Sequence, residues 1–254
     1  MRPRYPAAST FAYSFGPGSL TPAVKAIILA NVAMFVAQWI VTRTVGIPLD
    51  SFFGLRPVAV INGLQVWQLV TYMFLHGGIF HILFNMLALW MFGVELERMW
   101  GSRFFTKYYF VAGVGAAMTT LILSLTPVPF ANQLYYSLTI GASGAVYGVL
   151  LAYAMYFPNR PIYLYFVFAI PAKYFVMIIG AISLLSSMNE PGGGIAHTTH
   201  LGGLVVGYLY LKGGRVHVLS EIRYRYLKWR INRMRRRFDV YSGGRADDVD
   251  RRVH

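Results

Sequence analysis

Long apolar runs separated by short polar segments are the main pattern along this chain. Six runs are candidates for helices that cross a bilayer: 24–41, 80–94, 104–125, 143–157, 161–187 and 196–211. Crossing a bilayer takes about 20 predominantly apolar residues, and a helix satisfies its own backbone polar groups there. Within the fifth run, the helix is expected to start near Pro171. The pattern predicts an all-α membrane protein, a bundle of six transmembrane helices.

The segments between these runs differ in composition. Residues 42–75 mix aromatics and prolines without a clean spanning run, and Trp67 is among the aromatics that suit a membrane interface. We expect a large structured outer loop there, with short helices at the headgroup level. Residues 95–107 are expected to form a charged connection. Residues 126–140 and 188–195 are expected to be loops, and neither contains Lys or Arg.

The composition agrees with a membrane protein. The chain has 254 residues, of which 56% are hydrophobic and 13% are charged, whereas soluble domains carry about 25% charged residues. Cysteine is absent, which excludes disulfides and thiolate metal sites. We expect three parts: a disordered cytoplasmic segment over 1–22, a six-helix transmembrane domain over 23–211, and a basic cytoplasmic tail over 212–254.

The net charge of +14 bears on orientation and partners. Lys and Arg are concentrated in the N-terminal segment, in 95–107, in the turn at 158–161 and in the tail. Because positive residues gather on the cytoplasmic side of membrane proteins, we predict a multi-pass protein of the inner (plasma) membrane with both termini cytoplasmic. This placement explains the charge without nucleic acid as a partner.

The basic tail has a pattern of its own. Within 212–238, Ile222, Tyr226, Trp229 and Met234 fall at roughly helical spacing among many Arg and Lys residues. A basic amphipathic helix of this kind binds anionic lipid at a membrane surface. The alternative is a solvated run of charge, and we favour the lipid-binding interpretation.

A serine among small residues opens the fourth apolar run. Ser143 is a poor nucleophile without a base, and His200, near the start of the sixth run, is the candidate base. Each candidate is followed by two glycines four residues apart: Gly144 and Gly148, and Gly203 and Gly207. Such pairs let transmembrane helices approach closely. The alternative interpretation is ordinary helix packing, with a serine that bonds its own backbone.

Polar residues in the second run are candidates for stabilising an oxyanion. His81 and Asn85 are spaced i, i+4, so they share one helix face, and both can donate hydrogen bonds. Ionisable groups at membrane depth are costly and are functional candidates by default. Beside the backbone N–H of Ser143, they would form an oxyanion pocket. We expect His76 to order the outer loop, and His197 to be a structural neighbour of the candidate base.

The acidic residues limit the hydrolase chemistry that is possible. None of the nine lies inside a predicted apolar helix. Zinc hydrolases usually present His-Glu-x-x-His or a carboxylate base, and an aspartyl intramembrane protease needs two buried aspartates. We therefore expect no metal and no cofactor. Since no carboxylate is at hand to orient His200, a Ser–His dyad is favoured over a full triad.

Three motifs together resemble the bacterial rhomboid intramembrane serine proteases. They are His76-Gly-Gly-Ile-Phe-His81-Ile-Leu-Phe-Asn85, Gly141-Ala-Ser143-Gly144 and His200-Leu-Gly-Gly203-Leu-Val-Val-Gly207. The resemblance covers about residues 24–211. It implies a protease domain over 23–211 in which Ser143 is the nucleophile, His200 is the base, and His81 and Asn85 stabilise the oxyanion.

Further residues match the family or depart from it. Gly141 and Gly144 flank the serine, and Tyr147 matches the aromatic residue that packs against the family's catalytic histidine. Trp67 matches the first residue of the family's Trp-Arg loop motif, but Gln68 follows it here. The resemblance implies acyl transfer on transmembrane protein substrates. It also implies a preference for substrates with small residues at the cleavage site and with transmembrane helices that unwind easily near the membrane surface.

Three other classes of protein are less consistent with the sequence than a protease. A non-catalytic rhomboid-like factor that binds membrane proteins would normally lack Ser143 or His200. A transporter would more often show broken helices with buried acids. A basic-tailed anchor for nucleic acid or anionic lipid explains the tail but not the clustered Ser, His and Asn.

Overall fold

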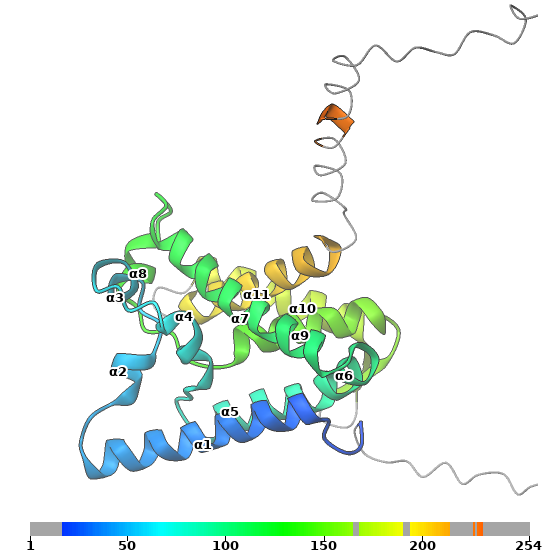
Figure 1. The fold of residues 1–254 in the computed structure, drawn as a ribbon, viewed down its shortest axis with the longest axis horizontal. Coiled ribbons are helices and arrows are strands. Elements are labelled where there is room, and N and C mark those ends of the chain that lie inside the picture. The colour runs from blue at the N-terminus through cyan, green and yellow to red at the C-terminus, as the bar shows by residue number, and fades with distance from the viewer. Residues whose placement is uncertain (1–16, 165–167, 190–193, 214–225, 227, 231–254) are drawn as a thin grey trace, which may run out of the picture. The chain divides into compact units, whose positions relative to one another are not determined.

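The computed structural model describes residues 17–164, 168–189, 194–213, 226 and 228–230, and these are mostly helical (Figure 1). The chain divides into two compact units, Met1–Leu211 and Lys212–His254. Of the predicted basic amphipathic segment, 212–238, the structure describes 212–213, where α11 ends, and 226 and 228–230, which are helical; the rest lies outside the described residues. The predicted disordered segment also lies outside them up to residue 16.

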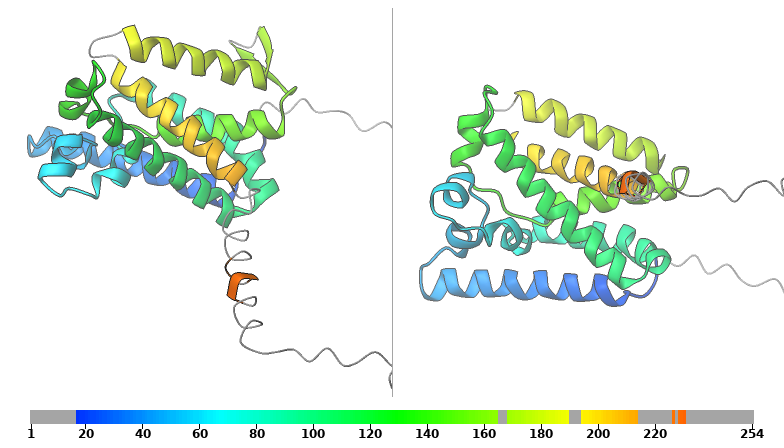
Figure 2. Two further views of the ribbon diagram at one scale, coloured as in Figure 1. Left: turned by 90° about the horizontal axis from the view of Figure 1, so that it is seen from above. Right: turned by 45° about the horizontal axis from the view of Figure 1, so that its top comes forward.

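Most of the predicted helices are present in the first unit. Its long helices are α1 (Pro22–Thr44), α7 (Ser102–Ser124), α9 (Ser143–Tyr156), α10 (Ala172–Asn189) and α11 (Gly194–Gly213). In Figure 2, α1 and α10 lie on opposite sides of this unit, with α7, α9 and α11 between them. Among its described residues, α10 starts one position after Pro171, as the sequence predicts.

The helix α7 supplies much of the buried centre of the bundle. Phe105, Tyr108 and Tyr109 are fully buried along it. The hydroxyl of Tyr108 donates to the Gly148 carbonyl oxygen of α9 over 2.7 Å. A buried hydroxyl is costly unless it is hydrogen-bonded, so this bond holds α7 and α9 in one relative arrangement.

The second predicted span is longer than its apolar run. A continuous helix is formed by α5 (Ile79–Ala88), a π-helical turn η2 (Leu89–Gly93) and α6 (Val94–Trp100). The prediction ended this helix at residue 94 because charges follow there. Glu, Leu, Arg and Met are good helix formers, so the helix continues until Gly101, whose φ of 77° permits the sharp turn into α7.

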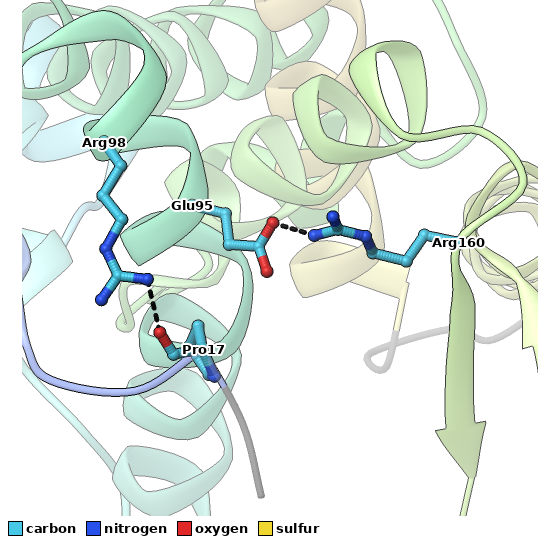
Figure 3. Close-up of polar contacts among 4 residues, drawn as sticks. All are labelled: Pro17, Glu95, Arg98 and Arg160. Carbon is cyan, nitrogen blue, oxygen red and sulfur yellow. Dashed lines mark hydrogen bonds and ion pairs between the residues drawn. The ribbon is translucent and has the colours of Figure 1, made fainter. Parts of the chain in front are cut away.

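The charges of α6 are therefore not in an open connection, and they hold neighbouring segments. Glu97 accepts hydrogen bonds from the first amides of α1, Ala23 N at 2.8 Å and Val24 N at 2.9 Å. Arg98 donates to the Pro17 carbonyl oxygen over 2.6 Å, and Glu95 pairs with Arg160 (Figure 3). The Glu97 and Arg98 contacts tie the start of α1 and the segment before it to the end of the second long helix, and the Glu95 pair ties that helix to Arg160, after α9.

The predicted loop over 42–75 contains short helices, as expected. They are α2 (Leu49–Phe53), α3 (Pro57–Asn62), α4 (Gln68–Thr71) and the 3₁₀ turn η1 (Tyr72–Phe74). A second short helix region, α8 (Ala131–Tyr136), lies in the 126–140 segment that was expected to be a loop. Leu55 and Thr139 form a β-bridge between the two segments, with both N–H···O bonds at 2.9 Å.

Gln68, which departs from the family motif, has a definite place in this loop. Its side chain is fully buried. The amide oxygen accepts from Arg56 N over 2.9 Å, and the amide nitrogen donates to Phe52 O over 3.1 Å and to Gln65 Oε1 over 2.7 Å. The buried, neutral amide of Gln68 therefore joins Phe52, Arg56 and Gln65 within the loop.

The all-α prediction is wrong in one segment. β1 (Pro161–Leu164) and β2 (Phe168–Pro171) pair antiparallel, with Ile162 opposite Ile170. In the sequence, this stretch is part of one long apolar run, 161–187. Its aromatic and β-branched residues favour strands, and Pro171 disfavours a helix before it, so the helix starts only after the hairpin.

Two helices among the described residues are long and apolar enough to cross a membrane, Pro22–Thr44 and Ile79–Trp100. Ser143–Tyr156 and Ala172–Ser187 are shorter apolar helices. That the chain has six transmembrane spans, and how they are oriented in the membrane, stay predictions.

Candidate active site

Ser143 is the first residue of α9, at the end of a loop that requires glycine. Gly141 has φ of 121°, a region that side-chain-bearing residues rarely adopt. A Cβ at Gly141 would also lie 2.7 Å from Nε2 of His81. Because Ser143 is in the first turn, its backbone N–H has no intrahelical acceptor. The loop therefore presents a hydroxyl and a backbone donor without an intrahelical partner at one helix N-terminus.

His200 of α11 is brought directly to this serine. Its Nε2 lies 2.7 Å from Ser143 Oγ, a hydrogen-bond distance. The imidazole stacks on the ring of Tyr147, with centroids 4.2 Å apart and planes at 9°. No described residue bonds the Nδ1 of His200. Within the described part of the chain, the arrangement is a serine and a histidine with an aromatic support.

The predicted glycine pairs lie at the closest approach of α9 and α11. A Cβ at Gly203 would overlap the carbonyl oxygen of Gly144. One turn further, a Cβ at Gly207 would lie 3.2 Å from the Gly148 Cα and 2.6 Å from the Tyr108 hydroxyl. Only glycine fits these positions, and their close packing is what lets His200 reach Ser143.

His81 and Asn85 both lie in α5. His81 lies against the loop that precedes Ser143. Nε2 of His81 faces the Gly141 backbone, and its Nδ1 accepts from Gly77 N over 3.3 Å. Asn85 is nearly buried and donates from Nδ2 to the His81 carbonyl oxygen over 2.8 Å. An amide nitrogen carries two hydrogens, so one remains for another acceptor.

Two further histidines lie beside the candidate residues, His76 next to His81 and His197 next to His200. The rings of His76 and His81 are 5.0 Å apart, and neither ring nitrogen of His76 bonds a described residue. Burial lowers the pKa of His76 to about 4, and the nearby His81 adds to the shift, so its ring is neutral at pH 7. The ring of His197 lies 5.8 Å from that of His200.

Two polar contacts near the histidine were not predicted from the sequence. Ser183 Oγ of α10 donates to the Tyr147 hydroxyl over 3.4 Å. Thr199 and Thr120 are joined by their hydroxyls at 2.8 Å. Single Ser and Thr residues are common in apolar helices, so nothing in the sequence distinguishes these from the others.

The described residues include no group of three His, Cys, Asp or Glu side chains that could hold a metal ion. What the site does contain is a hydroxyl bonded to an imidazole, with a backbone N–H and further donors nearby. Such an arrangement suits nucleophilic attack on a carbonyl, followed by proton transfer.

Comparison with protein families matches residues 63–214 to the rhomboid domain. The chain is similar to "Rhomboid protease GluP" of Bacillus subtilis (strain 168), at 33% identity over 161 residues, which cover 61% of this chain and 27% of the relative. It is 34% identical over 143 residues to "Rhomboid protein 1, mitochondrial" of Saccharomyces cerevisiae, covering 54% of this chain and 38% of that protein. The similarity to "Rhomboid protease AarA" of Providencia stuartii is 27% over 216 residues, 78% of this chain and 73% of the relative. The chain thus matches less than half the length of the first two relatives.

Proposed function

The chain belongs to the rhomboid family of integral membrane proteins, and on that premise we propose that it is an intramembrane serine endopeptidase. The observation that carries this proposal is the 2.7 Å distance between Ser143 Oγ and His200 Nε2. A serine is activated as a nucleophile when a base lies within hydrogen-bond reach. The substrates are membrane proteins, cleaved in or beside a transmembrane segment.

The reaction begins with proton transfer within the dyad. Ser143 Oγ attacks the carbonyl carbon of the scissile peptide bond, and Nε2 of His200 takes the hydroxyl proton. The negative charge that develops on the carbonyl oxygen is stabilised by the backbone N–H of Ser143, with His81 and Asn85 as further donors. Each donor is worth about 10²–10³-fold in rate in other hydrolases.

The tetrahedral intermediate collapses when His200 returns the proton to the leaving amine, so the peptide C–N bond breaks and an acyl-enzyme remains. Water then attacks the ester carbonyl, with His200 again as base. The second product leaves with the new carboxyl group, and Ser143 recovers its hydroxyl proton. Tyr147 keeps the imidazole plane fixed through both steps, since its ring is stacked on that of His200.

The proposed cellular setting follows from the distribution of charge. Both termini are cytoplasmic in the inner membrane, and the dyad lies toward the outer face, from which water enters. The basic tail binds anionic lipid. The many Lys and Arg residues of 212–238 support this attachment.

A serine-directed fluorophosphonate tests the proposal, because it reacts with an activated serine and not with an ordinary one. The purified protein should be labelled at Ser143, and labelling should be absent in Ser143→Ala. Ser124→Ala is the matched control: this serine is buried in α7 and its hydroxyl donates to its own helix at Leu121 O over 2.7 Å. A folded protein that stays unlabelled favours the non-catalytic rhomboid-like binding factor.

A further inference from the structure

A hydrogen bond between two helices lies next to the candidate base. Thr199 immediately precedes His200, and its hydroxyl is 2.8 Å from that of Thr120 in α7. Thr120 is 0% exposed and Thr199 is 1% exposed. The Thr120 hydroxyl also lies 3.2 Å from the Ala116 carbonyl oxygen. Buried hydroxyls are costly without partners, so this contact is expected to persist.

Beside this bond, the surface between α7 and α11 is made mostly of small residues, whereas further along the helices Phe104 and Tyr108 of α7 pack against Tyr210 of α11. A Cβ at Gly202 would lie 2.8 Å from the Thr119 Cβ and 3.1 Å from the Ala116 Cα. A Cβ at Gly115 would overlap the side chain of Val206. Small residues set a short distance between helices, but they offer few ridges against sliding along the axis. Close to His200, the directional hydrogen bond between the threonine hydroxyls adds a restraint on axial sliding to this packing.

His200 needs such a restraint because its own contacts are few. Stacking on Tyr147 resists tilting of the imidazole, yet parallel rings can slip past each other in their own plane. No described residue bonds its Nδ1, whereas in a Ser-His-Asp triad a carboxylate holds that atom. The position of His200 Nε2 therefore depends directly on the position of the α11 backbone.

We propose that the hydrogen bond between Thr120 and Thr199 is a positioning contact that sets the axial position of His200 against Ser143. The inference rests on the proposed function, since it concerns the geometry of the same dyad. Misplacement by about 1 Å can cost about 10²-fold in rate. Thr120 touches no reacting atom, so its loss lowers kcat and leaves KM nearly unchanged.

The test replaces each threonine by its isostere. Thr120→Val keeps the shape and removes the hydroxyl, and we expect kcat to fall about 10-fold or more with KM within about twofold. Thr120→Ser keeps a hydroxyl and should recover most of the rate. Thr119→Val is the matched control, because the Thr119 hydroxyl donates within α7 to Gly115 O over 2.9 Å. Thr199→Val removes the same bond and should lower kcat at least as much as Thr120→Val, and the double variant should be no slower than the slower of the two single variants.

The outcomes separate this inference from the proposed function. Suppose that cleavage by the wild type requires Ser143 but the kcat of Thr120→Val is within about twofold of the wild-type value. This result overturns the positioning role and still supports the protease function. An equal loss in Thr119→Val, or no recovery in Thr120→Ser, also overturns the positioning role. If both valine variants at 120 and 199 fail to fold while Thr119→Val folds, the bond serves the fold and the inference is wrong. A wild-type protein without Ser143-dependent cleavage contradicts the proposed function itself.

Discussion

His200 and Tyr147 show what single residues contribute to this site. The sequence predicted the pairing of Ser143 with His200 and the aromatic support at Tyr147, because each lies in a motif of specific spacing. It could not predict Ser183 or the threonine pair, since their partners come from helices whose relative rotation no local pattern specifies. Gly141 was part of the predicted serine motif, but the sequence did not explain why glycine is needed there. The structure explains it by the φ of 121° and by the closeness of His81.

At this scale we predict that the ring of Tyr147 matters and its hydroxyl does not. Tyr147→Phe keeps the stack on His200, which lies at 4.2 Å, and loses only the 3.4 Å contact with Ser183. Tyr147→Ala leaves the imidazole free to tilt. Steady-state cleavage should show near wild-type kcat for Phe and a loss of about 10–100-fold for Ala. Equal losses in the two variants would assign the role to the hydroxyl instead.

The helices show where hydropathy succeeds and where it does not. The glycines of α9 and α11 were predicted to lie together, and they do. The extension of the second helix through α6, the short helix α8 and the hairpin of β1 and β2 were not predicted. Apolar content measures burial in a bilayer, whereas the end of a helix depends on caps and breakers such as Gly101 and Pro171. The sequence predicts no role for Gln68, because its partners Phe52 and Arg56 are brought to it only by the folded loop.

The helix contact itself gives a prediction. Gly203→Ala places a methyl group against the Gly144 carbonyl oxygen, so α9 and α11 must separate. Overpacking of this kind costs about 1–3 kcal/mol, and we expect a lower melting temperature together with loss of cleavage. Gly180→Ala in α10 is the control, since its Cβ would lie at an ordinary 3.4 Å from Leu204 Cδ1. A Gly203→Ala variant with wild-type melting and activity would show that the helices are not as close as described.

For the whole molecule, the apolar runs predicted a helical membrane protein, and family membership agrees with that. The six spans and the orientation are harder to establish, because they depend on a bilayer that the chain alone does not contain. The charge asymmetry remains the physical argument for both termini in the cytoplasm. The chain divides into two compact units after Leu211, and the three-part organisation stays a prediction.

Topology is tested with cysteines, since the chain has none of its own. We predict that Asn132→Cys is labelled by an impermeant maleimide in intact cells and that Asn159→Cys is labelled only after lysis. Both positions carry Asn in the natural chain, so the substitutions are matched. The reverse labelling pattern would mean that the orientation in the membrane is opposite to the predicted one, with the dyad toward the cytoplasmic face.

The tail is predicted to be an attachment and not part of the catalyst. Truncation after Gly214 should retain cleavage in detergent, where no anionic surface is present. In vesicles with anionic lipid, the intact tail should add salt-sensitive binding, because each Lys or Arg near such a surface contributes about 1 kcal/mol. Full loss of detergent activity in a truncated protein that melts normally would assign the tail a role in the fold of the site or in the chemistry.

The central claim is that Ser143 and His200 act as one catalytic unit. It is tested most directly by cleavage of a transmembrane substrate with purified Ser143→Ala, His200→Ala and the double variant, with Ser124→Ala as control and thermal melting alongside. Members of such a unit are strongly non-additive, so either single change should abolish cleavage to about the same extent as both. Ser143→Ala removes one oxygen and should melt like the wild type. A Ser143→Ala protein that folds normally and cleaves near the wild-type rate would contradict the account.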